Sequence, residues 1–244
     1  MSGKRETKSA NRKAGRQRWE PSNGKRQAGN GKRLRWGIVL GVLVTQACQG
    51  VTPPDRAIPY AYRLAPQNLA FHWPANRLPV RYWVQPAGAL PAMVRAALER
   101  WEAQFLYGEF RGAIVADSTA ADVRVRFDGP PPPTAEPNDA PPVDACGGTT
   151  SLALDPGNRL TAPLDVRVRW FGGYAATDVA NCLWRVTAHE IGHSLGLLAH
   201  SDDAGDLMFG APFGFPTARE PSARDRATVQ TAYHTPADIS PPGL

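Results

Sequence analysis

The twelve-residue string H-E-I-G-H-S-L-G-L-L-A-H, from His189 to His200, constrains the fold of this chain more than any other stretch. In an α-helix, residues four positions apart lie one turn apart on the same face, so the imidazoles of His189 and His193 are expected side by side. Glu190 projects one step round the helix. Gly196 tolerates the left-handed backbone that commonly ends a helix. The string therefore predicts a helix, a sharp turn at Gly196 and a return of His200 toward the other two histidines.

Side chains in this arrangement suit one metal ion. Three neutral imidazoles and a water molecule make a tetrahedral zinc site with one exchangeable position. A carboxylate at Glu190 is offset from direct ligation, yet it is close enough to take a proton from the water. We therefore assign His189, His193 and His200 as zinc ligands and Glu190 as the catalytic base.

The same string resembles the signature of the metzincin zinc peptidases, in which a third histidine follows a glycine turn. Ser201, directly after His200, is similar to the matrixin branch of that family. The segment D-L-M-F, from Asp206 to Phe209, lies where the family has its Met-turn. The resemblance thus implies that Met208 packs beneath the metal without binding it.

The turn departs from the family pattern by one residue. Metzincins have two residues between the glycine and the last histidine, whereas this chain has three, at positions 197–199. Two arrangements remain open. The extra residue bulges outward and leaves His200 in place, or Asp202 or Asp203 ligates the metal instead.

Hydrophobic periodicity predicts a sheet packed on helices. Apolar residues alternate in three segments and recur at helical spacing in three others. The expected strands cover 78–84, 122–127 and 164–170, and the expected helices run from Pro91 to about Phe105, from Asp178 as N-cap to Gly196, and from Ala223 to Tyr233. The helix at 178–196 should bury one stripe, made of Ala180, Trp184, Ala188, Ile191 and Leu195. With the resemblance, these elements indicate an α+β, metzincin-like fold. It has a twisted, mostly parallel sheet, two long helices, a zinc-site helix that ends in a glycine turn, and a C-terminal helix.

Charge divides the chain near Trp36. Residues 1–36 hold twelve Lys and Arg against two Glu, a net +10, so the remainder of this +6 chain sums to −4. An uncharged apolar stretch follows, and its roughly ten apolar residues are too few to cross a bilayer comfortably. We expect a basic disordered leader (1–36), a signal-like segment (37–48), a linker (49–69), a catalytic domain (70–235) and a C-terminal tail (236–244). Cleavage of the signal-like segment, lipid attachment at Cys48 and a retained membrane tether all remain open.

Two further features leave alternatives open. Cys146 and Cys182 would form an even pair in an oxidising compartment, so they are candidates for a disulfide, the alternative being two separate buried thiols. The acid and glycine cluster of Asp144, Gly147, Asp155 and Asn158 could bind a structural calcium, as the resemblance implies, or could simply be solvated.

The resemblance implies a zinc endopeptidase that hydrolyses peptide bonds in proteins or peptides. The signal-like segment indicates that the protein is exported, and we expect a monomer. Residues 209–221 would shape the pocket for the residue after the cut. The alternative is a catalytically silent, zinc-containing binding or adhesion protein of the same fold. Glu190 speaks against that alternative, because a structural zinc site needs four closed ligands and no base. We expect no nucleic-acid partner, because the basic leader has no aromatic residue interleaved beyond Trp19 and no nucleic-acid module follows it.

Overall fold

A computed structural model of the chain describes residues 57–140, 143–210 and 219–242. The basic leader, the signal-like segment, Cys48 and the first part of the linker lie outside these residues, and so does much of the segment 209–221. Within the described ranges, no helix combines the length and the apolar character that crossing a membrane requires.

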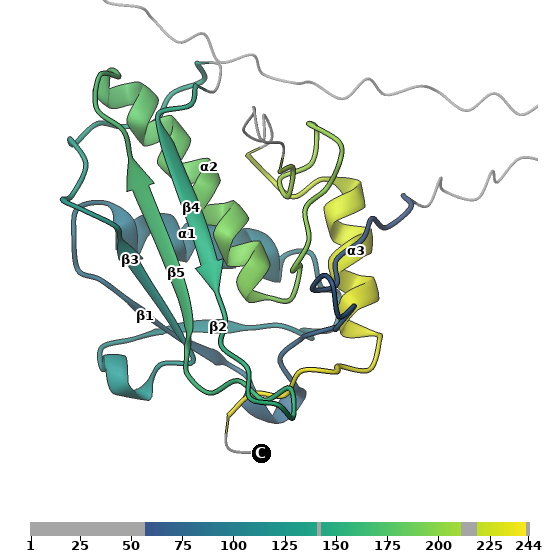
Figure 1. Cartoon of the computed structure of the whole chain (residues 1–244). Helices are drawn as coiled ribbons and strands as arrows, with labels where there is room; N and C mark the ends of the chain where they lie inside the picture. The colour runs from purple at the N-terminus through teal and green to yellow at the C-terminus, as the bar shows by residue number, and fades with distance from the viewer. Residues whose placement is uncertain (1–56, 141–142, 211–218, 243–244) are drawn as a thin grey trace, which may run out of the picture. The chain divides into compact units, whose positions relative to one another are not determined.

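One layer of the fold is a five-stranded sheet with the strand order β2-β1-β3-β5-β4 (Figure 1). Strands β1, β2, β3 and β5 pair in parallel, whereas β4 pairs with β5 antiparallel and forms an edge. The strands are β1 (Val80–Val84), β2 (Gly112–Val115), β3 (Val123–Phe127), β4 (Cys146–Ser151) and β5 (Leu164–Trp170). The predicted α+β fold with a mostly parallel sheet is confirmed.

Strands β2 and β4 were not predicted from the sequence. β2 has only four residues, all of them half-buried. β4 reads C-G-G-T-T-S, in which two glycines and three hydroxyl residues replace the apolar alternation that marks a half-buried strand. Hydrophobic periodicity therefore did not predict the edge strand β4.

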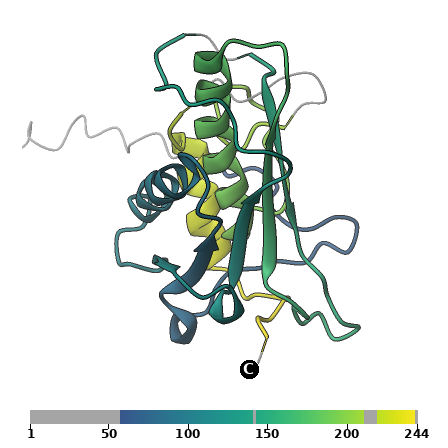
Figure 2. The same ribbon diagram turned by 90° about the vertical axis from the view of Figure 1, so that its left-hand side faces the viewer.

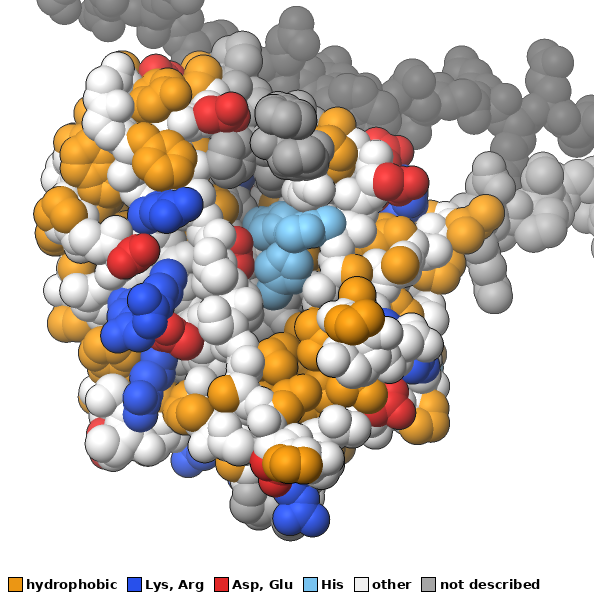
Figure 3. Space-filling view, viewed as in Figure 1, with side chains coloured by type: hydrophobic (Ala, Val, Ile, Leu, Met, Phe, Trp, Pro, Cys, Tyr) orange, Lys and Arg blue, Asp and Glu red, His pale blue; other side chains and the backbone are white. Residues whose placement is uncertain are grey.

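The two long helices cover one face of the sheet (Figure 2). These are α1 (Leu90–Glu102) and α2 (Ala176–Ser194). Inward-facing residues of the central strands are fully or almost fully buried against them, whereas the alternate residues point outward. The outward positions carry arginines, and Figure 3 shows Lys and Arg side chains gathered on one side of the surface. Among the outward-pointing strand residues, Arg126 and Arg167 pair with Asp165 at 2.9 and 2.6 Å.

Helix α2 differs from its prediction in its first residue and in how much of its surface is buried. It begins at Ala176 with Ala175 as N-cap, so Asp178 lies inside the first turn and is not the cap. The predicted single buried stripe is too narrow, because the helix packs against both α1 and the sheet and is buried on most sides. Trp184, expected in the stripe, is only partly buried, whereas the polar residues Asn181 and Arg185 are buried.

Two tryptophans hold α2 in place from neighbouring segments. The indole Nε1 of Trp101 on α1 donates to the carbonyl oxygen of Ala188 at 2.8 Å, and Nε1 of Trp73 donates to that of Ser194 at 2.8 Å. A disulfide between Cys146 and Cys182 joins the start of β4 to α2. Helix α2 is therefore fixed against α1 and the segment before β1 by hydrogen bonds, and against the edge strand β4 by the disulfide.

The third helix, α3 (Ala223–Tyr233), and the residues after it hold the first described residues of the chain. The backbone N–H of Tyr60 donates to Thr228 Oγ1 at 3.1 Å, and the hydroxyl of Tyr62 donates to Thr235 Oγ1 at 3.1 Å. After the helix, Ile239 is buried, and its N–H donates to the carbonyl oxygen of Ala70. The packed unit thus extends beyond the expected limits of 70–235 in both directions.

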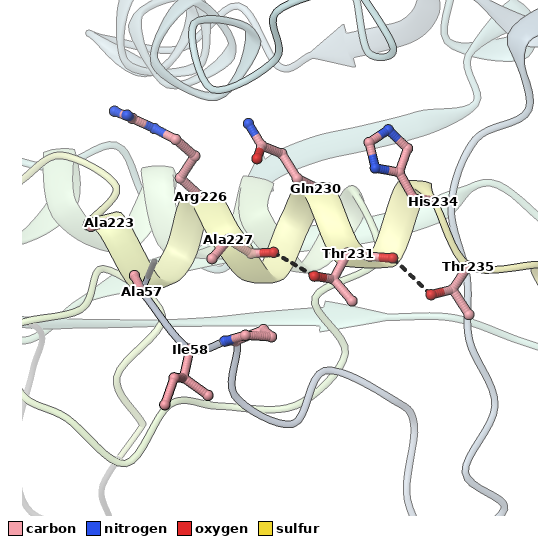
Figure 4. A pocket seen from close by; sticks show the side chains of 10 residues that line it. Ala57, Ile58, Ala223, Arg226, Ala227, Gln230, Thr231, His234 and Thr235 are labelled. Carbon is pink, nitrogen blue, oxygen red and sulfur yellow. Dashed lines mark hydrogen bonds between the residues drawn. The ribbon is translucent and has the colours of Figure 1, made fainter. Parts of the chain in front are cut away.

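The outer side of α3 borders a broad groove of about 860 Å³ (Figure 4). Within it, Thr231 and Thr235 each donate a hydroxyl hydrogen bond to the carbonyl oxygen four residues earlier, at 2.7 and 2.8 Å. Exposed Ile58 lines the opposite wall. These two hydroxyls already donate to backbone carbonyl oxygens, so neither is a free donor for a ligand in the groove.

Candidate functional site

His189 and His193 project from adjacent turns at the C-terminal end of α2, as their spacing predicts. Their ring centroids lie 4.7 Å apart, and the ring of His200 lies 5.2 Å from His189 and 4.8 Å from His193. One ligand atom from each of the three rings lies within 4.8 Å of the others. Figure 3 shows histidine side chains together in a hollow of this face.

Gly196 makes the turn that brings His200 back. Its φ of +115° lies in the region that favours glycine, and a Cβ at this position would overlap the carbonyl oxygen of Phe71. The extra residue is absorbed between the turn and the ligand. Leu197 is fully buried, and the N–H of Leu198 donates to the carbonyl oxygen of Tyr62 at 2.7 Å.

The structure distinguishes the two arrangements that the longer turn leaves open. His200 lies with the other two histidines, and its Nε2 is 3.1 Å from Nε2 of His193. Asp202 and Asp203 instead pair with Arg224 at 2.9 and 3.2 Å. In the described part of the chain, the three histidines are the only group of three or more His, Cys, Asp or Glu side chains arranged to hold a metal.

The donor set fits zinc. Two nitrogens bound tetrahedrally at about 2.0–2.1 Å lie roughly 3.3 Å apart, close to the observed separation between His193 and His200. Nδ1 of His189 lies 2.8 Å from the carbonyl oxygen of Leu207, and Nδ1 of His193 is within hydrogen-bond distance of that of Leu197. These carbonyls accept from Nδ1–H, which leaves Nε2 free to bind the ion.

Burial favours the neutral imidazoles that a metal requires. It lowers the pKa of His189 to about 4, and it also lowers the pKa values of His193 and His200. For His193, the neighbouring histidines add to the effect of burial. All three rings are therefore unprotonated at neutral pH, which is the ligand form.

Glu190 lies under the edge strand β4. A Cβ on Gly148 would come 2.5 Å from Cγ of Glu190, so the glycine leaves room for this side chain. Thr150 Oγ1 donates to Oε2 of Glu190 at 2.7 Å. Burial raises the pKa of Glu190 to about 7, although the Thr150 hydrogen bond lowers it. A carboxyl group with this pKa is suited to accept and release a proton near neutral pH.

Met208 packs beneath the histidines. It is fully buried, and a Cβ on Gly192, between the two helical histidines, would overlap its sulfur. The following chain runs beside the returning loop, with the N–H of Ser201 donating to the carbonyl oxygen of Met208 at 2.8 Å. A Cβ on Gly210 would overlap the ring of His200, so this turn also shapes the loop side of the site.

Asp225 anchors that turn from the first turn of α3. Its buried carboxylate accepts from the N–H groups of Leu207 at 2.7 Å, Met208 at 3.3 Å and Ser222 at 2.8 Å, and from the hydroxyl of Tyr60 at 2.5 Å. Burial, followed by the charge and hydrogen bond of Asp225, raises the pKa of Tyr60. The anchor thus connects α3, the Met208 turn and the first described residues.

The sequence interpretation missed Asp225, Thr150 and Tyr60. The sequence did contain a signal for Asp225, because a serine followed three residues later by an acidic residue is the pattern of a helix capping box. Ser222 and Asp225 form such a box at the start of α3. No local pattern indicated Tyr60 or Thr150. Tyr60 bonds to Asp225, which is 165 positions away, and Thr150 bonds to Glu190, which is 40 positions away.

A cleft of about 580 Å³ opens over the site. It is bordered by β4 and the returning loop, and its lining includes Gly148, Thr150, Glu190, His193, Leu198 and His200. The larger groove along α3 contains none of the three clustered histidines. The two remaining histidines have other partners, His72 near the carbonyl oxygen of Thr235 at 3.1 Å and His234 near Glu109 at 3.6 Å.

Asp155, one residue of the candidate calcium cluster, stabilises a local turn. Oδ1 of Asp155 accepts from the N–H groups of Gly157 and Arg159 at 2.8 and 2.9 Å, which stabilises a turn. Calcium binding stays a prediction.

Comparison with known proteins agrees with this geometry. The family model of the matrixins matches residues 82–234, which is more than half of the chain. Interstitial collagenases of Equus caballus and Sus scrofa are each 41% identical to it over 73 residues, or 29% of this chain and 14% of the relative. Matrix metalloproteinase-18 of Xenopus laevis is 41% identical over 73 residues, or 15% of its length. The similarity to these relatives therefore spans only about one seventh of their length, whereas the family match extends over the whole site, and the chain belongs to the matrixin family.

Proposed function

We propose that this protein is a zinc-dependent endopeptidase that hydrolyses peptide bonds in proteins. The observation that supports the proposal most strongly is the convergence of three neutral imidazoles beside a buried carboxylate, within an open cleft. His189, His193 and His200 would hold the ion, which leaves one position of a tetrahedral site for water or substrate.

When bound, zinc supplies a Lewis acid for the scissile carbonyl and lowers the pKa of a water molecule to about 7. Glu190 accepts a proton at its carboxylate and delivers it to the nitrogen of the leaving amine. Thr150 holds the carboxylate of Glu190 in one orientation by its 2.7 Å hydrogen bond. The carbonyl oxygens of Leu207 and Leu197 hold the rings of His189 and His193.

The edge strand β4 offers a way to align an extended substrate. Its free edge borders the cleft beside Glu190 and His193. An exposed strand edge can pair with an extended peptide through main-chain hydrogen bonds. We propose that a protein segment binds along β4 with its scissile bond over the histidines.

We also propose that the protein is exported and acts as a monomer. The Cys146–Cys182 disulfide supports export, because disulfides persist in oxidising compartments. The signal-like segment 37–48, and its cleavage, lipidation or retention as a tether, stay predictions, as do the domain limits outside the described residues.

The test is cleavage of an unbiased peptide mixture by the zinc-loaded protein and by Glu190→Gln. The wild type should cut within peptides, and Glu190→Gln should retain zinc while losing more than about a hundredfold in rate, since general acid–base catalysis contributes about 10²–10⁴-fold. Removing zinc with a chelator should abolish cleavage, and adding it back should restore it. A wild type that binds zinc but cuts nothing would favour the silent binding or adhesion protein. Equal rates for both proteins would remove Glu190 as the base.

A further inference from the structure

A buried arginine on α2 has no use in the proposed reaction. Arg185 is 5% exposed, and its Nε and Nη1 are buried without any hydrogen-bond partner in the described structure. It lies four residues before His189, so it projects from the same side of the helix about 6 Å further along the axis. Buried guanidinium N–H groups are normally satisfied, so these two donors require an explanation.

The side chain borders a cavity of about 140 Å³ between α1, α2 and two loops. This volume exceeds that of several water molecules, each of which occupies about 30 Å³ in the liquid, and is large enough for a carboxylate or a sulfate. Three of its six lining residues are arginines: the lining consists of Arg100, Pro137, Asn181, Trp184, Arg185 and Arg219.

The charges around the cavity do not balance. Arg100 pairs with Glu220 at 2.8 Å, and Arg219 pairs with Asp139 at 2.9 Å. Each of these carboxylates is largely exposed, with side-chain exposures of 64% and 104%, and neither bonds to Arg185. Burial and then the charge of Arg219 lower the pKa of Arg185, yet arginine stays protonated in proteins. One buried positive charge is thus left over.

We propose that this cavity binds a small oxyanion, as a carboxylate or a sulfate-like group. The Nε–H and Nη1–H groups of Arg185 lie on different edges of its planar guanidinium, so an oxyanion in the cavity would accept a charge-assisted hydrogen bond from one of them. Arg219 adds a second cation and Trp184 an apolar wall. Binding would satisfy one of the free donors and would balance the excess charge of Arg185.

The oxyanion can come from two sources. One is a free inorganic anion. The other is an acidic side chain of the substrate, since Arg185 lies only one helical turn from His189 and Arg219 belongs to the segment expected to shape the pocket beyond the cut. The second source rests on the proposed function, whereas the first does not.

Sulfate titration tests the proposal without any reliance on catalysis. Thermal unfolding of the folded protein is followed as sulfate replaces chloride at constant ionic strength. The wild type should gain a saturable rise in melting temperature, and Arg185→Met should bind sulfate at least about tenfold more weakly, because hydrogen bonds to charged groups are among the stronger ones. Arg95→Met, a change at an exposed arginine of α1, is the matched control and should respond as the wild type does.

A second variant guards against a folding defect. Arg219 has a side chain 36% exposed, so Arg219→Gln should fold and bind sulfate several-fold more weakly. An equal sulfate response in the wild type, Arg185→Met and Arg219→Gln would overturn the proposal, as would no saturable response in the wild type. In that case water alone fills the cavity.

Matched peptides identify the source. Peptides that contain glutamate or glutamine at the same position are bound to zinc-loaded Glu190→Gln, with and without sulfate. Preference for the glutamate peptide, with competition by sulfate, assigns the cavity to substrate carboxylates. Saturable sulfate binding without peptide preference assigns it to a free anion. Both results support the oxyanion site, and a failure of the wild type to cleave any peptide would leave the sulfate result unchanged.

Discussion

The two halves of the histidine site are built in different ways. His189, Glu190 and His193 belong to one continuous helix, α2, whereas His200 and Met208 lie on a loop outside any helix or strand. The helical half derives its geometry from the 3.6-residue repeat. The loop half derives its geometry from distant residues, such as Asp225, Tyr62 and Phe71, that hold the chain at chosen points. Damage to a remote anchor should therefore affect the loop half and spare the helix.

The largest effect should follow removal of a ligand from either half. His193→Ala and His200→Ala should each lower zinc affinity by more than about a hundredfold, because loss of an outer partner alone costs about 10–100-fold. His234→Ala, which changes a largely exposed histidine outside the site, is the control. Equilibrium zinc competition with a chromogenic chelator measures the difference. Unchanged affinity in His200→Ala would mean that another residue completes the site.

Loss of the α3 anchor should disturb the loop half first, and through the carbonyl oxygen of Leu207 it should also loosen the ring of His189. Asp225→Asn replaces a carboxylate that accepts four hydrogen bonds by an amide with only one acceptor oxygen. We expect the free energy of unfolding to fall by about 3 kcal/mol and zinc affinity to fall by about tenfold. Denaturant unfolding and zinc competition would show this, with Asp128→Asn, a change at an exposed acid, as the reference. Wild-type zinc affinity in Asp225→Asn would separate the anchor from the site.

A second glycine allows the two requirements at Gly196, a positive φ and close contact with the backbone of Phe71, to be tested separately. Gly196 and Gly173 both have positive φ, at +115° and +92°, but only Gly196 lies against another backbone segment. Gly173→Ala should cost about 1 kcal/mol of strain, and Gly196→Ala about 2 kcal/mol more from overlap with Phe71. Thermal or denaturant unfolding of the two variants compares them. Equal losses would show that the fit against Phe71 contributes nothing.

The smallest loss of stability should follow removal of the Tyr60 hydroxyl, which bonds to Asp225. Tyr60→Phe removes the hydrogen bond to Asp225 and should cost about 1 kcal/mol, since this carboxylate keeps its three backbone donors. Tyr62→Phe, which loses a 3.1 Å bond to Thr235, provides a matched comparison. If Tyr60→Phe loses as much stability as Asp225→Asn, the backbone donors contribute little.

The sequence predicted the helical half of the site closely, because the spacing of His189 and His193 specifies their geometry. It assigned His200 as the third ligand and kept Asp202 or Asp203 as the alternative, since nothing near the longer turn specifies where Leu198 is held or what pairs with Arg224. The strands rich in alternating valines were found, whereas β4 was missed because glycine and threonine occupy the positions that face Glu190. What escaped prediction depends on contacts between residues far apart in the chain.

The convergence of three imidazoles on one ion can be measured directly by X-ray absorption fine structure at the zinc edge of the zinc-loaded protein. We expect three imidazole nitrogens and one oxygen at about 2.0–2.1 Å from the zinc. A first shell with two imidazoles and additional carboxylate oxygens would contradict it, because His200 would then lie outside the site.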